Sequence, residues 1–162
     1  MRLIFCLSII LFTHGCSIQN NRSENCVIKD SIFINKIFFN TDKFEDVVTL
    51  FLKKGYSSIN TNEKISDNHL NNIIQLKKGN NVVSYIEGDA SAFYAEICDS
   101  EIAFYHSIKI GNTIDDFIQK SGHDVDKSCN SVKLMDENGV GTITFYFKNN
   151  ALNKVIVDFE VP

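Results

Sequence analysis

Short segments rich in β-branched and aromatic residues make up most of the chain after residue 26, and turns of Gly and Asn separate them. Such segments are typical of half-buried strands, because branched and ring side chains pack well on a pleated surface. We expect strands at residues 32–39, 73–77, 82–87, 92–98, 102–110, 132–135, 142–148 and 154–160. We expect turns at residues 78–81, 137–139 and 149–150, where Gly and Asn tolerate positive φ.

Two segments break this pattern and predict helices. In residues 42–54, apolar side chains recur at i, i+3, i+4 and i+7, namely Phe44, Val47, Val48 and Phe51. In residues 113–121, Thr113 and Asp116 have the spacing of a capping box, and Gly122 can end the helix in a left-handed conformation. Both helices therefore have defined ends and one apolar face.

Together these elements predict an α+β fold in which the helices pack on one face of an antiparallel sheet. We expect a single domain over residues 27–162, with halves at about 27–107 and 108–162. Residues 36–41 and 109–113 enter the two helices with similar sequences, which suggests a tandem repeat of a helix followed by antiparallel strands. Chance similarity between two well-capped helices remains the alternative.

The first fifteen residues have the features of a bacterial-type signal peptide. Met1 and Arg2 give a positive start, residues 3–12 are apolar except for Ser8, and residues 13–15 are small or polar. A span of this length is too short to cross a bilayer as a helix but fits a secretory signal. A buried N-terminal strand or helix is disfavoured, because the polar residues 17–25 would separate it from the fold.

Residues 13–16 (THGC) resemble the lipobox of bacterial lipoprotein signals. Gly15 and Cys16 match that motif, whereas Thr13 stands where the family usually has Leu and His14 is also atypical. The resemblance implies that Cys16 carries the lipid and that residues 16–26 tether the domain to an envelope membrane, the outer membrane being favoured. The domain would then lie in the periplasm or at the cell surface. The alternative is an ordinary signal cut nearby, with Cys16 free or in a disulfide.

Three cysteines follow Cys16 in the sequence, namely Cys26, Cys98 and Cys129. Exported proteins keep disulfides, so one intrachain bridge is expected. We expect Cys98 to pair with Cys129, because Cys26 is near the expected mobile terminus. If Cys16 is not lipidated, four cysteines permit two bridges. The chain has no Cys-x-x-Cys and no Cys/His cluster, so we expect no metal.

Residues 110–122 (IGNTIDDFIQKSG) are similar to the helix motif of small envelope lipoproteins of the BamE (SmpA/OmlA) type. Gly111, Thr113, Phe117 and Gly122 match, whereas His123 stands where a Pro commonly follows. The segment and the strands after it, about a third of the chain, also resemble the tandem-repeat fold of the β-lactamase inhibitory protein. The resemblance implies a domain that binds other proteins and performs no chemistry.

Charge and motifs exclude several other functions. The formal net charge is −4 and the lysines are scattered, so we expect no nucleic-acid partner. No G-x-S-x-G motif or phosphate-binding loop occurs, and we expect no cofactor. His123, Asp124 and Asp126 form the one compact His/carboxylate cluster, which we interpret as a loop after a helix.

The sequence therefore predicts an exported lipoprotein, not an enzyme, that binds another envelope or secreted protein. Its role would be that of an assembly accessory, an inhibitor or an immunity-type factor. One alternative is a small exported enzyme with a site around His123, Asp124 and Asp126. Another is a carrier of an apolar ligand between helices and sheet. An exposed concave sheet lined by Phe and Tyr would favour binding, and an acidic or His cluster in a pocket would favour the enzyme.

Overall fold

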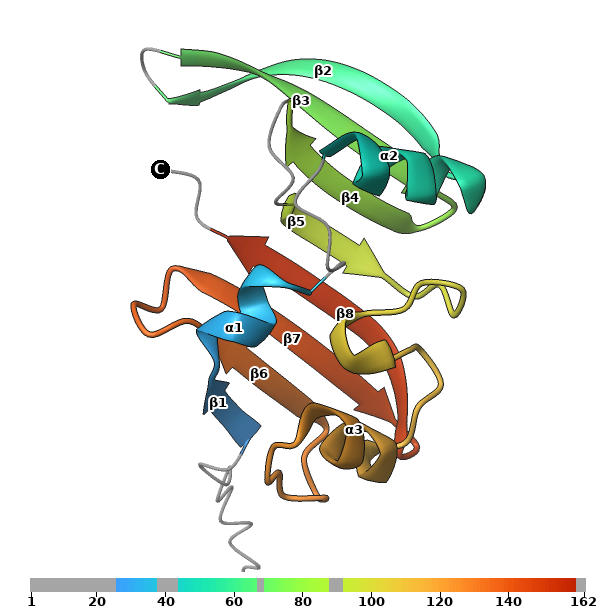
Figure 1. Cartoon of the computed structure of the whole chain (residues 1–162), viewed down its shortest axis with the longest axis vertical. Coiled ribbons are helices and arrows are strands. Elements are labelled where there is room, and N and C mark those ends of the chain that lie inside the picture. The colour runs from blue at the N-terminus through green and yellow to red at the C-terminus, as the bar shows by residue number, and fades with distance from the viewer. Residues whose placement is uncertain (1–25, 38–43, 67–68, 88–91, 160–162) are drawn as a thin grey trace, which may run out of the picture.

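The computed structural model describes residues 26–37, 44–66, 69–87 and 92–159. Its centre is one eight-stranded sheet with the order β1-β6-β7-β8-β5-β4-β3-β2 (Figure 1). The strands are β1 (Val27–Lys29), β2 (Ser57–Ser66), β3 (His69–Lys78), β4 (Asn81–Ile86), β5 (Ala92–Ile97), β6 (Ser131–Met135), β7 (Gly141–Lys148) and β8 (Ala151–Phe159). The helices are α1 (Ser31–Asn35), α2 (Phe44–Lys53), α3 (Ile114–Ser121) and the short 3₁₀ helix η2 (Tyr105–Ser107).

The predicted α+β fold is wrong, because the sheet dominates the structure. The α-helices have only 5, 10 and 8 residues. Pairing of β5 with β8 also joins the strands of both expected halves into one sheet. The sheet is mixed, since β1 runs parallel to β6 and the other neighbouring pairs are antiparallel. Good capping residues show where a helix begins, but they do not make it long enough to form a layer.

Several local predictions are confirmed. The two expected helices are present as α2 and α3, although residues 42–43 lie outside the described part of the chain. Thr113 and Asp116 form the expected capping box, and Gly122 ends α3 with φ of 75°. The turn between β7 and β8 has Asn149 and Asn150 at φ of 52° and 63°, as such hairpin turns require.

The strand predicted at residues 32–39 is wrong where the structure describes it, because α1 occupies Ser31–Asn35. Asp30 caps this helix, and its Oδ1 accepts a hydrogen bond of 2.9 Å from the backbone N–H of Phe33. Phe33 and Ile34 are then buried. An apolar run this short suits a strand and a buried helical turn equally well, and the cap decides in favour of the helix.

The strand predicted at residues 102–110 is also wrong. The segment reverses direction through η2, where His106 and Ser107 have φ of 57° and 59°. A single bridge between Ala103 and Lys109 holds the two sides of this loop together. Two successive residues in the left-handed region cannot continue an extended strand, so the β-branched residues on either side pack into the core instead.

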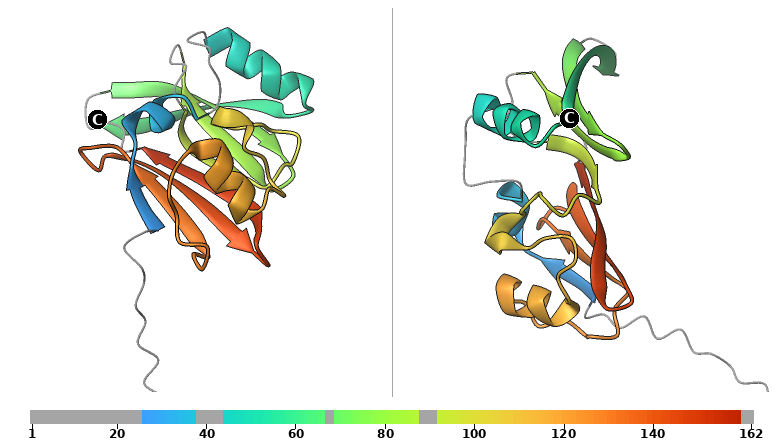
Figure 2. Two further views of the ribbon diagram at one scale, coloured as in Figure 1. Left: turned by 60° about the horizontal axis from the view of Figure 1, so that its bottom comes forward. Right: turned by 90° about the vertical axis from the view of Figure 1, so that its right-hand side faces the viewer.

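The hydrophobic core lies on one side of the sheet. Figure 2 shows all the described helices on that side, with none on the other. Phe145 of β7 is fully buried, and its ring contacts those of Phe33, Phe104 and Phe117 at centroid distances of 5.9, 6.3 and 4.9 Å. No helix among the described residues is long and apolar enough to cross a membrane.

Candidate functional site

The side of the sheet that faces away from the helices is the main candidate surface. Burial alternates along β7, where Ile143 and Phe145 are buried while Thr144 and Tyr146 are half-buried. We call the second set of positions the uncovered face, because no described helix lies over it (Figure 2). In the central strands it consists of Tyr94, Glu96, Thr142, Thr144, Tyr146, Lys154, Ile156 and Asp158.

Four of these side chains interact across three strands, and we call them the tyrosine–charge cluster. Lys154 Nζ of β8 lies 3.2 Å from Glu96 Oε1 of β5. The hydroxyl of Tyr94 donates to the other oxygen of Glu96 at 3.5 Å. The ammonium of Lys154 also lies 5.3 Å from the centroid of the Tyr146 ring on β7. The cluster therefore consists of Tyr94, Glu96, Tyr146 and Lys154.

Two groups of the cluster have a raised pKa, Lys154 and Tyr94. The hydrogen bond to Glu96 raises the pKa of Lys154 above its usual value. Partial burial and then the Glu96 carboxylate raise the pKa of Tyr94. The side chains of Lys154 and Glu96 remain 33% and 35% exposed, so a partner can reach both. The cluster presents an ordered cation, an anion and two phenol rings.

A second group of polar residues lies at the end of β5. Asp99 has a side chain that is only 8% exposed and lies 2.9 Å from Lys78 Nζ. Burial by itself would raise the pKa of Asp99, but hydrogen bonds from the Glu101 N–H and from Lys78 outweigh this effect and lower it. Burial and then Asp99 raise the pKa of Tyr56. We interpret these contacts as structural, because they fix the loop after β5 to β3.

The three residues of the predicted His/carboxylate cluster have different surroundings. Nε2 of His123 lies 3.0 Å from Oδ2 of Asp30, a residue far away in the sequence. Asp126 Oδ1 accepts a hydrogen bond of 2.8 Å from the Ser128 N–H, and Asp124 is exposed. Within the described residues, no group of three or more His, Cys, Asp or Glu side chains could hold a metal ion. The sequence did not indicate the contact between Asp30 and His123, because the only signal at Asp30 is that of a helix cap.

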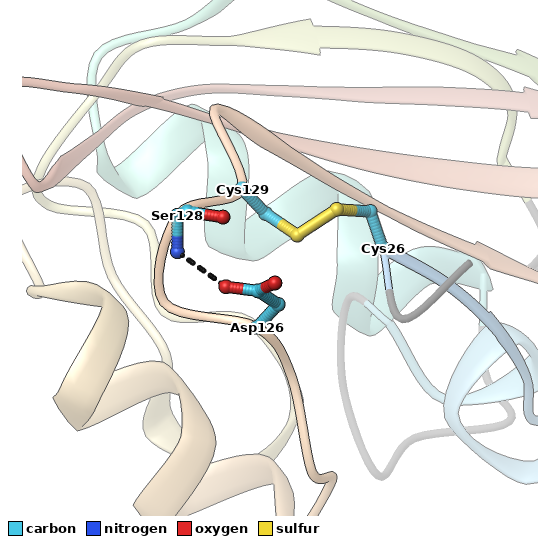
Figure 3. The surroundings of a disulfide bond; sticks show 4 residues. All are labelled: Cys26, Asp126, Ser128 and Cys129. Carbon is cyan, nitrogen blue, oxygen red and sulfur yellow. Dashed lines mark hydrogen bonds between the residues drawn. A yellow bond between two sulfur atoms is a disulfide. The ribbon is translucent and has the colours of Figure 1, made fainter. Parts of the chain in front are cut away.

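The disulfide joins Cys26 to Cys129, and Figure 3 shows the bond beside the loop that carries Asp126 and Ser128. Its Cα atoms are 6.0 Å apart, within the usual range. The predicted pairing of Cys98 with Cys129 is therefore wrong, and Cys98 is exposed and free. The prediction failed because Cys26 does not belong to a mobile terminus. It directly precedes β1, which pairs with β6 just after Cys129.

The predicted signal peptide of residues 1–15, the lipidation site Cys16 and the tether up to residue 25 lie outside the described residues. Comparison with family models, curated proteins and solved structures finds no match for this chain. The resemblance of residues 110–122 to BamE-type lipoproteins therefore stays a prediction.

Proposed function

We propose that this chain is an envelope lipoprotein, anchored through Cys16, whose domain binds another protein through the uncovered face of the sheet. The observation that carries the proposal is the tyrosine–charge cluster on that face. Tyr94 and Tyr146 offer large rings that lose little conformational entropy on binding, and tyrosine is enriched in protein interfaces. The ion pair between Lys154 and Glu96 already orders the side chains between the rings.

The rigidity of the surface supports this function. The strands of the cluster have buried residues on their other side, including Ala95, Val155 and Val157, each with no exposed area. The backbone below the cluster is thus fixed by the core. A surface that is ordered before contact loses less entropy when a partner binds, which raises affinity for a given contact area.

The two other functions considered from the sequence have less support. A carrier of an apolar ligand needs space between helices and sheet, whereas the rings of Phe33, Phe117 and Phe145 fill part of that layer. An enzyme with His123 as its base would need that imidazole near a nucleophile. The carboxylate of Asp30 faces His123 and also caps α1, which gives the pair a structural role.

The test is capture of the partner by variants of the processed protein. Wild-type protein, a Tyr94→Ala/Tyr146→Ala variant and a Tyr105→Ala variant are immobilised and exposed to envelope extract. Tyr105 is a half-buried tyrosine on the helix side, so it serves as the matched control. We expect a specific protein to be retained by wild type and by Tyr105→Ala but lost from the double variant.

Circular dichroism of each variant checks that its fold is intact. A partner retained equally by the double variant would contradict the use of this face. Mass spectrometry of the mature N-terminus tests the anchor separately, since it must show an acylated Cys16. An unmodified Cys16 would contradict the lipoprotein part of the proposal and leave the binding face untouched.

A further inference from the structure

The edge of the uncovered face at β1 and β6 carries a compact group of four side chains. Cross-strand pairs join Val27 to Lys133 and Lys29 to Met135. Ile28, between the two β1 residues, packs against the core, so its neighbours point to the uncovered face. We call Val27, Lys29, Lys133 and Met135 the edge block. Its two lysines lie on one diagonal and its two apolar side chains on the other.

The lysines of the edge block belong to the lysines of the described residues that form no ion pair. Lys78, Lys127 and Lys154 each form an ion pair with a carboxylate. Within the described part of the chain, neither Lys29 nor Lys133 has a carboxylate oxygen within 4.0 Å. The edge block thus presents two ammonium groups that no carboxylate within 4.0 Å neutralises, although Asp30 and Asp136 directly follow its residues in the chain.

The block also exposes apolar surface. Val27 is 52% exposed, and Met135 is half-buried beside the lysines. Apolar side chains that alternate with lysines suit the boundary between lipid headgroups and acyl chains, because the lysines meet anionic phosphates while the apolar groups enter the interface.

The number of residues between Cys16 and β1 limits how far the edge block can lie from a membrane that holds the lipid of Cys16. Cys16 is ten residues before Cys26, which at most about 3.6 Å per residue spans roughly 36 Å when fully extended. A lipid on Cys16 would therefore hold the first strand, and with it the edge block, close to the bilayer.

We propose that the edge block rests on the headgroups of anionic lipids and orients the domain on the membrane. This inference depends on the lipid anchor of the proposed function. Three strand spacings of about 4.8 Å separate β1 from β8, so Lys154 of the tyrosine–charge cluster lies about 14 Å from the contacting edge. Because the edge block and the tyrosine–charge cluster share one face of the sheet, the domain would tilt so that β1 and β6 meet the lipid while β8 and β5 remain available to a protein partner.

The test measures vesicle binding without the anchor. The chain from residue 16 to residue 162 with Cys16→Ser retains every described contact, since these lie within residues 26–159. It is sedimented at low salt with vesicles of phosphatidylcholine alone or with about one third phosphatidylglycerol. We expect binding only to the anionic vesicles, and we expect Lys29→Gln/Lys133→Gln to weaken it roughly thirtyfold.

The matched control is Lys53→Gln/Lys109→Gln, which removes two exposed lysines away from β1 and β6. We expect the control to bind anionic vesicles as wild type does, and Val27→Ser to weaken binding by a smaller factor. Absence of wild-type binding, or equal weakening in both double variants, would overturn the inference. An unacylated Cys16 in the native protein removes the anchor but does not change this vesicle result, so the two failures can be distinguished.

Discussion

The Cα atoms of Cys26 and Cys129 lie 6.0 Å apart although 103 positions separate the two residues in the sequence. The bond links the N-terminal end of β1 to the start of β6. The first described residue is therefore joined covalently to a part of the chain that is synthesised late. Three further contacts follow within a few residues: the β1–β6 ladder, the cap of Asp30 on α1 and its pair with His123.

Loss of the disulfide should destabilise the domain strongly. A bridge across about 100 residues removes chain entropy from the unfolded state worth about 4–5 kcal/mol. We expect Cys129→Ser to lower the free energy of unfolding by about this amount in urea titrations. Cys98→Ser is the control and should leave stability unchanged, because that thiol is exposed and free. With reductant present, wild type and Cys129→Ser should unfold alike, and a remaining large difference would contradict the assignment.

The capping box of α3 predicts a smaller effect. Thr113 Oγ1 accepts a hydrogen bond from the Asp116 N–H at 3.1 Å, and the Asp116 carboxylate accepts one from the Thr113 N–H at 2.9 Å. Thr113→Ala should cost about 1 kcal/mol in chemical unfolding. Thr49→Ala, at an exposed position inside α2, should change stability little or raise it slightly. Equal effects of the two substitutions would argue against the cap.

Packing around Phe145 predicts a large effect of truncation. Its side chain has no exposed area and contacts three other aromatic rings. Phe145→Ala should therefore destabilise the domain by about 3–5 kcal/mol, measured by urea unfolding. Leu52→Ala, where the side chain is 45% exposed, is the control and should cost much less. A cost below about 1 kcal/mol for Phe145→Ala would contradict the core described above.

Asp99 predicts a dependence of stability on acid pH. Its pKa is lower in the folded chain than the ordinary value of 3.8, so folding favours the carboxylate. The resulting stabilisation is complete above pH 3.8 and is lost as the pH falls through the lower folded value. Asp99→Asn should flatten the stability profile in this acid range. Parallel profiles for wild type and Asp99→Asn would refute the expectation.

The sequence predicted correctly those features that depend on residues close together in the chain. Thr113 and Asp116 are three positions apart in the sequence and interact directly. Asn149 and Asn150 adopt the positive φ that Asn tolerates in a hairpin turn. The predicted segments at 82–87, 92–98 and 142–148 match β4, β5 and β7 within one residue. These features depend on backbone preferences that each short segment carries by itself.

Long-range pairing could not be predicted in the same way. The pairing of β5 with β8 and of β1 with β6 joins segments that are distant in the sequence, and no spacing rule indicates such partners. Strand β2 was missed because its sequence, SSINTNEKIS, is polar, as suits an edge strand. The tyrosine–charge cluster depends on the pairing of β5 with β8. The sequence alone therefore does not show that Lys154 and Glu96 are neighbours.

The position of the disulfide has a mechanical consequence. A pulling force on the chain ahead of Cys26 reaches the sulfur–sulfur bond before it reaches the hydrogen bonds of β1. The load passes directly to Cys129 and the start of β6, an inner strand of the sheet. Strand β1, with only three residues, is thus shielded from being peeled off its neighbour. In the oxidised state a force applied ahead of Cys26 therefore acts on the inner sheet, and the hydrogen bonds of β1 do not carry it.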